Sequence, residues 1–455
     1  MTSDQAVAIR HRLFPCQVSS SRLPARAPTV ILCSPLSFEN AAQGLAQNLS
    51  EEGYEVILFH ITSGHKSSQA ENTDAVASVI VQTTCSQAGN GQGWNRYTVL
   101  VTIDLPAELS GLPSALHHAA GPQTGISAYV AYGCQDHRTA NLLSSLPFPS
   151  TIHIAENAKD VMKAFVDEVE AGRLDSRALP FTPGLSKFDG ALGPEEPLAV
   201  SVFTYANVSP TDSAKWACAF PFSSHTRDYA FSSGVEDADR SAGATSYSRT
   251  LSLLKKTVGP RFPLEQLWDQ HTYFEFADRD SARTMATMVS QPYVNHVACL
   301  TGGAGAEELA RFYEHHFTKV SPPDTKLIPI SRTIGTDRII DEMVFSCTHT
   351  TKLDYFLPGI EPTGKPLQIP MVGIVNLRGD KLAFESLYWD QSNALVQLGL
   401  LDPNTSATIP KTTLPITGHL VAQKILNPYG VPSNTLMPNW SDSADLPLPP
   451  PHEES

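Results

Sequence analysis

The chain lacks any long hydrophobic run. Although 41% of its 455 residues are hydrophobic, no segment approaches the ~20 consecutive apolar residues of a membrane-spanning helix. Residues 1–20 include Arg10, His11 and Arg12 but no apolar stretch of signal-peptide length. We therefore expect a soluble, cytoplasmic protein that has no membrane partner.

Positive charge and paired cysteines are also scarce. The chain has 32 Lys and Arg against 46 Asp and Glu, which gives a formal net charge of −14. Nucleic acid and anionic membranes both require clustered Lys and Arg, so neither is expected as a partner. The seven cysteines are scattered and never spaced Cys-x-x-Cys. This pattern favours reduced thiols and predicts no zinc site or disulfide framework.

A chain of this length is expected to form two or three hydrophobic cores. Its first part alternates short apolar runs with segments of helical spacing, a pattern that predicts an α/β domain with a parallel sheet. The predicted strands are Thr29–Ser34, Tyr54–Phe59, Tyr97–Asp104, Ile126–Tyr132, Thr151–Ala155 and Leu198–Tyr205.

This first part resembles the dienelactone hydrolase branch of the α/β-hydrolases. The likeness comes from the opening strand-helix-strand unit, from Tyr132-Gly133 after a strand, from Pro149–Asp160, and from Tyr229-Ala-Phe231. The resemblance implies a nucleophile on a sharp turn of the form Gly-x-Ser/Cys-x-Gly.

That turn is incomplete in this sequence. Ser127 lacks the closing glycine, Cys134 lacks both glycines in register, and Ser34 follows the first strand rather than a central one. Tyr229 stands where the family has its catalytic histidine, with His225 upstream, and tyrosine cannot shuttle a proton near neutrality as imidazole does. We therefore expect a degenerate domain over residues 1–260.

The chain changes character after Val258-Gly-Pro260, which predicts a domain boundary. Pro263 is expected to open a helix, in which Trp268, His271 and Glu275 share one stripe. A histidine on such a stripe is either a satisfied core residue or part of a pocket wall. The carboxylate one turn further along favours the wall.

From Lys326 the hydrophobic period changes to two, which predicts an antiparallel sheet. Helices followed by a curved antiparallel sheet describe an α+β cone, expected over residues 261–431. A proline-rich acidic tail, 432–455, is expected to be disordered. The predicted strands are Leu327–Ile334, Arg338–Thr350, Leu367–Leu377 and Leu382–Asp390, the last two joined by the tight turn Arg378-Gly-Asp380.

The last predicted strand has two different faces. Phe384, Ser386, Tyr388 and Asp390 lie on one face, and Ala383, Glu385, Leu387 and Trp389 lie on the other. Asp390, a carboxylate among aromatic residues at a strand end, could have a raised pKa and act as an acid or base. It could equally cap the turn that follows.

Several segments of this second part resemble the SnoaL-like domain, a nuclear-transport-factor-2-like cone. They are Glu275–Asp280, Thr284–His296, Ser331–Asp337, Asp341–Met343, Thr348–Thr350, Leu357–Gly359, Pro362–Lys365, Tyr388–Gln391 and Gln397–Asp402. Such a domain occurs fused to dienelactone hydrolase homologues in fungi and bacteria. The resemblance implies that Asp390 matches an aspartate that does acid-base work in polyketide cyclases, and that a homodimer could form through this domain. Those fused relatives usually carry histidines where Phe384 and Ser386 stand.

These observations leave three functions open. The first is a cofactor-independent cyclase, isomerase or lyase that acts on a polyketide-like or aromatic small molecule of secondary metabolism. Its candidate catalytic residues are Asp390, His296 and His271, and its candidate substrate-binding residues are Trp268, Glu275, Tyr293, His349, Tyr388 and Trp389. The second is a hydrolase in the first domain, and the third is a non-catalytic binding or assembly protein.

No cofactor or metal ion is expected for any of these functions. The adjacent His315 and His316 would point about 100° apart on a helix, so they cannot both bind one ion easily.

Overall fold

The computed structural model describes residues 9–19, 22–23, 26–61, 69–87, 97–120, 125–133, 139–180, 199–209, 213–217, 236–404, 418–420 and 422–423. The chain divides into two compact units. The first comprises Met1–Pro263 with Arg378–Asp380, and the second comprises Leu264–Leu377 with Lys381–Ser455. The tail expected at 432–455 lies outside the described residues. Among the described residues, no helix is both long enough and apolar enough to cross a bilayer.

A seven-stranded sheet forms the centre of the first unit, in the order β1-β3-β2-β4-β5-β6-β7. The six predicted apolar runs form its six parallel strands, and β1 joins the edge antiparallel to β3. The strands are β1 (Ile9–Phe14), β2 (Thr29–Pro35), β3 (Glu55–Ile61), β4 (Thr98–Ile103), β5 (Ile126–Tyr132), β6 (Ser150–Ala155) and β7 (Val200–Tyr205).

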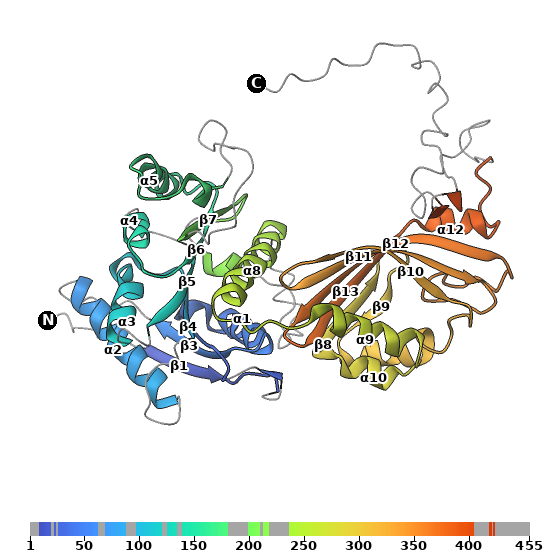
Figure 1. The fold of residues 1–455 in the computed structure, drawn as a ribbon, viewed down its shortest axis with the longest axis horizontal. Helices are drawn as coiled ribbons and strands as arrows, with labels where there is room; N and C mark the ends of the chain where they lie inside the picture. The colour runs from blue at the N-terminus through green and yellow to red at the C-terminus, as the bar shows by residue number, and fades with distance from the viewer. Residues whose placement is uncertain are drawn as a thin grey trace, which may run out of the picture. The chain divides into compact units, whose positions relative to one another are not determined.

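Helices cover both faces of this sheet, because its parallel strands are apolar on both sides. Buried residues of α1 (Glu39–Glu51), α6 (Ser213–Ala217) and α8 (Asp237–Thr257) pack on one face. The other face is covered by helices α2 to α5 (Figure 1). These are α2 (Gln69–Gln87), α3 (Leu112–Ala120), α4 (Thr139–Ser144) and α5 (Lys159–Glu170). The first unit is therefore an α/β layered domain, as predicted.

The second unit is a six-stranded sheet in the order β10-β11-β12-β13-β8-β9, accompanied by helices. Strand β13 runs parallel to β8, while β10 with β11, β11 with β12, and β8 with β9 pair antiparallel. The strands are β8 (Met288–His296), β9 (Thr301–Ala304), β10 (Lys326–Ile334), β11 (Arg338–Thr348), β12 (Pro366–Arg378) and β13 (Lys381–Trp389). The sheet is mixed rather than purely antiparallel, because β8, which period two alone did not reveal, inserts beside β13.

The helices of this unit are short. They are α9 (Leu264–Phe276), α10 (Ser281–Ala286), α11 (Ala306–Phe312) followed by a π-helical turn η5 (Tyr313–Phe317), and α12 (Gln391–Gln397). Helices α9 and α10 run along one side of the curved sheet (Figure 1). The predicted stripe of α9 is buried there, including Trp268, His271 and Glu275.

Strand β9 shows why glycine is needed in this unit. Gly302 has a φ of +122°, and a Cβ added to it would lie 2.1 Å from the carbonyl oxygen of Val294 on β8. Only glycine allows the backbones to approach so closely.

Candidate functional site

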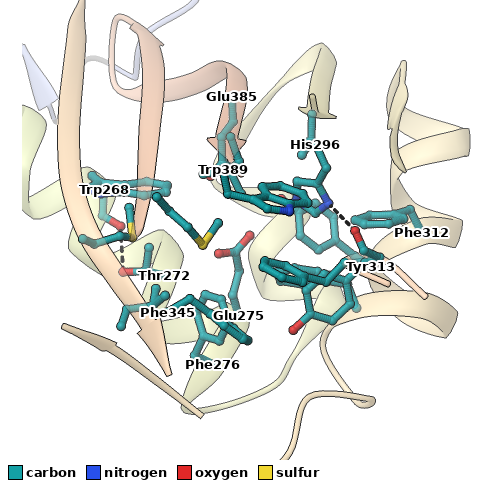
Figure 2. A pocket seen from close by; sticks show the side chains of 18 residues that line it. Trp268, Thr272, Glu275, Phe276, His296, Phe312, Tyr313, Phe345, Glu385 and Trp389 are labelled. Carbon is teal, nitrogen blue, oxygen red and sulfur yellow. Dashed lines mark hydrogen bonds between the residues drawn. The ribbon is translucent and has the colours of Figure 1, made fainter. Parts of the chain in front are cut away.

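A pocket opens between α9, the π-helical turn η5 and the inner face of the second sheet. About 540 Å³ of space that no atom fills lies between its lining side chains, open solvent at the mouth included. Nine of its eighteen lining side chains are aromatic. Figure 2 shows the carboxylate of Glu275 in the cavity among these apolar side chains. The pocket is thus an apolar chamber with very few polar groups.

Register explains which side chains of the sheet reach the pocket. Strand β13 pairs with β8 so that Glu385 lies beside Val294 and Leu387 beside His296. Side chains alternate along a strand, so these four residues share the inner face. All four line the pocket.

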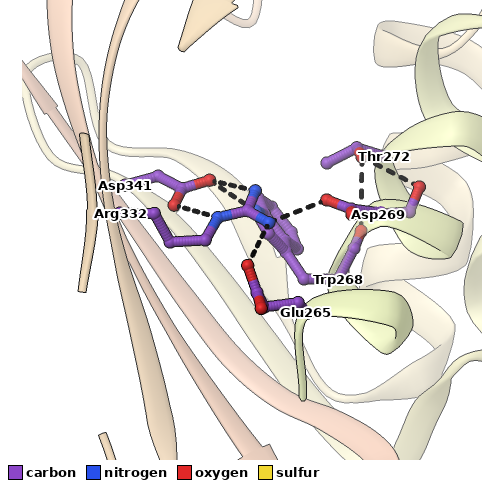
Figure 3. Close-up of polar contacts among 6 residues, drawn as sticks. All are labelled: Glu265, Trp268, Asp269, Thr272, Arg332 and Asp341. Carbon is purple, nitrogen blue, oxygen red and sulfur yellow. Dashed lines mark hydrogen bonds and ion pairs between the residues drawn. The ribbon is translucent and has the colours of Figure 1, made fainter. Parts of the chain in front are cut away.

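One wall of the pocket, the Trp268 ring, is fixed by an ion-pair network (Figure 3). The indole Nε1 of Trp268 donates to Asp341 Oδ2 at 2.8 Å. Arg332 donates to both oxygens of Asp341, at 2.7 and 2.8 Å, and to Asp269 on α9 at 2.9 Å. A two-pronged guanidinium-carboxylate contact fixes orientation as well as position. The network therefore holds the Trp268 ring against the cavity.

Behind the pocket, His271 and Glu275 share a proton. The hydroxyl of Thr287 donates to the Thr284 carbonyl at 2.6 Å, so its oxygen must accept from His271 Nδ1, which lies 2.6 Å away. His271 Nε2 then faces Glu275 Oε1 at 3.0 Å. Because an imidazole lone pair and a carboxylate would repel each other at that distance, one proton must lie between them.

Tyr313 completes this cluster from η5. Its hydroxyl lies 3.4 Å from His271 Nε2. Burial first, and then the neighbouring carboxyl groups of Glu275 and Glu385, raise the pKa of the phenol well above its ordinary value. Tyr313 is therefore a neutral phenol in contact with the His271–Glu275 pair.

Glu385 is the most unusual group in the pocket. Its side chain is 4% exposed and lines the cavity, yet its carboxyl makes no hydrogen bond with any residue of the described chain. Burial first, and then the negative charge of Glu275, raise the pKa of Glu385 well above its ordinary value. An unpaired carboxylate is costly to bury, which favours the neutral carboxylic acid form of this group.

His296 supplies the complementary group on β8. Its Nδ1 lies 2.9 Å from the Thr301 hydroxyl and 3.1 Å from the Tyr355 carbonyl oxygen. A carbonyl can only accept, so Nδ1 carries the hydrogen and Nε2 keeps a free lone pair. Burial lowers the pKa of His296 to about 4, which keeps the ring neutral. The pocket thus contains a proton donor, Glu385, and a proton acceptor, His296.

His271, Glu275 and Glu385 also have the spacing that a metal ion could use. All three are buried, and their ligand atoms lie within 4.8 Å of one another. The same side chains can instead hold two protons, one between His271 and Glu275 and one on Glu385. The three side chains therefore fit either a metal ion or these two protons. Treatment with a chelator distinguishes the two arrangements.

Four of the residues singled out from the sequence line the pocket: Trp268, Glu275, His296 and Trp389. His271 lies directly behind them, in contact with Glu275. The fold thus brings residues of the predicted helical stripe together with residues of the predicted strand, which is over a hundred positions further along the chain.

Three other predicted substrate-binding residues lie elsewhere. Tyr293 is on the opposite face of the sheet, stacked on Phe384 with ring centroids 4.9 Å apart. Tyr388 is 45% exposed, and buried His349 contacts Thr363 through Nδ1. None of these predicted residues lines the pocket.

The expected position of Asp390 needs correction. Asp390 is exposed and caps helix α12, accepting hydrogen bonds from the backbone N–H groups of Ser392 and Asn393 and from both of their side chains. Partial burial raises its pKa, but these hydrogen bonds outweigh burial and hold the pKa below its ordinary value. Of the two roles that the sequence left open, the structure supports the cap.

Glu385 and Tyr313 were missed at the sequence level. Glu385 lies on the face of β13 opposite the one assigned to the site, between Ala383 and Leu387. A single carboxyl group on an otherwise apolar strand face was the available signal. Tyr313 lies on the π-helical turn η5, and nothing in the local sequence indicates its contact with His271.

Two of the hydrolase candidates of the first unit are among the described residues, and both lie within strands. Ser127 lies within strand β5 rather than on a turn after it, and Ser34 is buried on β2. Cys134, His225 and Tyr229 lie outside the described residues.

Neither a protein-family model nor a curated protein sequence matches the chain. Solved structures similar to part of the chain include an NTF2-like protein from Burkholderia thailandensis, with 17% identity over 31% of this chain and 98% of that one, at a TM-score of 0.24. A protein described as a SnoaL-like polyketide cyclase, from a Jannaschia species, has 15% identity over 31% and 99%, also at 0.24. TsrD from Streptomyces laurentii has 17% identity over 31% and 99%, at 0.26.

Proposed function

We propose that the second unit is a cofactor-independent enzyme that performs cyclase, isomerase or lyase chemistry by moving protons on a small apolar molecule. The observation that carries this proposal is Glu385, a buried carboxyl that has no partner among the described residues and faces an apolar pocket. Perturbed titratable groups in a pocket are typical of active sites.

The two inward groups of the sheet can act as an acid and a base. Glu385 gives its proton to a carbonyl oxygen or an imine nitrogen, which acidifies the adjacent C–H bond. Nε2 of His296 takes the proton from that carbon. His296 is a weak base because of its low pKa, so the reaction depends on the simultaneous help of Glu385.

The surrounding residues support this chemistry. The Glu275-His271-Tyr313 cluster fixes the groups that surround Glu385 and keeps it protonated. Aromatic walls exclude water, which strengthens each polar contact inside the pocket. We propose a bicyclic or similarly sized aromatic substrate, of the kind found in secondary metabolism.

For the first unit we propose a degenerate α/β-hydrolase-like scaffold without catalytic activity. Ligands of open parallel sheets bind at the carboxyl ends of the strands. Here the Tyr132 hydroxyl bonds Thr250 at 2.6 Å, and His153 bonds both Tyr205, at 2.8 Å, and Thr250, at 3.1 Å. Burial, and then the charge of Arg249, lower the pKa of His153 to about 3. These groups satisfy one another, which favours a structural role.

Deuterium exchange tests the proposed function without knowledge of the natural substrate. Two probes, 2-tetralone and 1-methyl-3,4-dihydroisoquinoline, carry an exchangeable C–H next to a carbonyl or an imine. The full-length protein in D2O should accelerate exchange of at least one probe, followed by NMR. Glu385→Gln should lower that rate by about 10²–10⁴.

The control is Glu342→Gln, the same chemical change on β11, next to inward-facing Met343 and therefore on the opposite side of the sheet. It should leave the exchange rate unchanged. Absence of exchange with both probes, or full exchange in Glu385→Gln, would contradict the proposal.

A further inference from the structure

Among the described residues, the pocket is lined by acids and by no strongly basic side chain. Two carboxyl groups, Glu275 and Glu385, line it, and none of the eighteen described lining residues is Lys or Arg. An anionic ligand would have to approach these acids without any compensating positive charge. Such a pocket therefore favours ligands that bring a positive charge with them.

The free polar atoms of the pocket are mainly acceptors. Nε2 of His296 has a lone pair and no hydrogen. Glu385, once ionised, can only accept, and its carboxyl has no partner among the described residues. Two phenols line the pocket, and both are paired: the Tyr313 hydroxyl lies 3.4 Å from His271 Nε2 and the Tyr355 hydroxyl 3.1 Å from the Ser321 hydroxyl. A complementary ligand therefore carries N–H donors.

The aromatic walls favour the same ligand. Trp389 stacks on Phe356 with ring centroids 4.4 Å apart and an interplanar angle of 8°, and Trp268, which also lines the pocket, is held by Asp341. The faces of indole rings are electron-rich and attract cations, most strongly where water is excluded.

We infer that the substrate of this pocket carries a protonatable nitrogen, an amine or an imine, which pairs with Glu385 while the attached ring system packs between Trp268 and Trp389. This inference rests on the proposed function for the identity of the site, but it concerns binding and can be tested without turnover.

Proton balance distinguishes two forms of the ligand. A neutral amine or imine takes the proton of the Glu385 carboxylic acid and leaves an ammonium-carboxylate pair, with no proton exchanged with solvent. A ligand that is already protonated forces Glu385 to release its proton to solvent. The groups that face Glu385 are Glu275 and His271 from α9, Tyr313 from η5 and His296 from β8, and Glu275 already holds a proton shared with His271.

Calorimetric titration of the full-length protein with three ligands of the same skeleton tests the inference. These are 2-aminotetralin, which is cationic at neutral pH, 2-tetralol, which is neutral, and tetralin-2-carboxylate, which is anionic. We expect the amine to bind at least about tenfold tighter than the alcohol, and the carboxylate not to bind measurably. Titrations in buffers of different ionisation enthalpy should show release of one proton per amine bound.

Glu385→Gln should abolish both the preference for the amine and the proton release, whereas Glu342→Gln should retain both. Equal affinity for the amine and the alcohol would overturn the inference, as would a preference that survives in a folded Glu385→Gln protein. Circular dichroism on the same preparations verifies folding. Preference for the amine without exchange of either probe would uphold this inference and contradict the proposed function. Exchange without a preference for the amine would support the proposed function and contradict this inference.

Discussion

Replacing Glu385 by glutamine should make the protein more stable at neutral pH, although it changes a buried side chain. Glutamine has nearly the same shape as a protonated glutamate but cannot ionise. In the folded chain, burial and the charge of Glu275 raise the pKa of Glu385 well above its ordinary value. The unfolded chain has no such constraint.

The pH dependence follows from this difference. Glu385 ionises in the unfolded chain near pH ~4.3, while the folded chain keeps the proton. The stability that its raised pKa confers on the folded state is complete below the unfolded pKa and is lost as pH rises toward the folded pKa. The loss is about 1.4 kcal/mol per pH unit, hence about 3 kcal/mol between pH 5 and pH 7 if the folded pKa lies above that interval.

Urea unfolding of wild type, Glu385→Gln and Glu342→Gln at pH 4, 5, 6 and 7 measures this effect. Glu385→Gln should have a free energy of unfolding close to that of wild type at pH 4 and should gain on it with each unit above. Glu342→Gln should follow wild type throughout. A constant difference between wild type and Glu385→Gln at every pH would refute the reasoning, because it would mean that Glu385 has the same pKa in both states.

Four other changes have defined outcomes. Asp341→Asn removes the partner charge of Arg332 and should cost about 1–3 kcal/mol in urea unfolding, with weaker binding of 2-tetralol because Trp268 is released; unchanged binding would contradict that positioning role. Asp390→Ala removes a helix cap and should cost about 1 kcal/mol while probe exchange persists; lost exchange in a folded protein would return Asp390 to the chemistry. His296→Gln should lower probe exchange by about 10²–10⁴, and full exchange would exclude His296 as the base. Because the folded pKa of His296 is lowered to about 4, wild type should lose stability as the pH falls from ~6.5 to about 4, and the variant should lack this loss. Treatment with EDTA should change neither exchange nor the thermal midpoint, and a loss restored by added metal would show that His271, Glu275 and Glu385 bind an ion.

The sequence predicted β13 well but not its orientation. Period-two alternation placed a strand at Leu382–Asp390, and the structure forms it at Lys381–Trp389. Alternation defines two faces and does not say which faces inward. Both faces of this strand carry aromatic residues, and Phe384 is also buried, against Tyr293. The polar residues Ser386 and Asp390 made the outer face look functional.

Helix α9 was easier to interpret because a helix on a sheet buries only one stripe. Trp268, His271 and Glu275 fall on that stripe and lie at or beside the pocket. The parallel pairing of β8 with β13 could not be predicted, since it joins segments about ninety positions apart through backbone contacts that leave no pattern in either strand. That pairing is what places His296 beside Leu387 and completes the site.

The central claim is that Glu385 is a neutral carboxylic acid facing the pocket at neutral pH. Infrared spectroscopy detects this state directly, because the C=O stretch of a carboxylic acid is separate from the bands of a carboxylate. The difference spectrum of wild type minus Glu385→Gln in D2O at pH 7 should contain one carboxylic acid band, absent from the difference between wild type and Glu342→Gln. A difference spectrum with carboxylate bands alone would contradict the account.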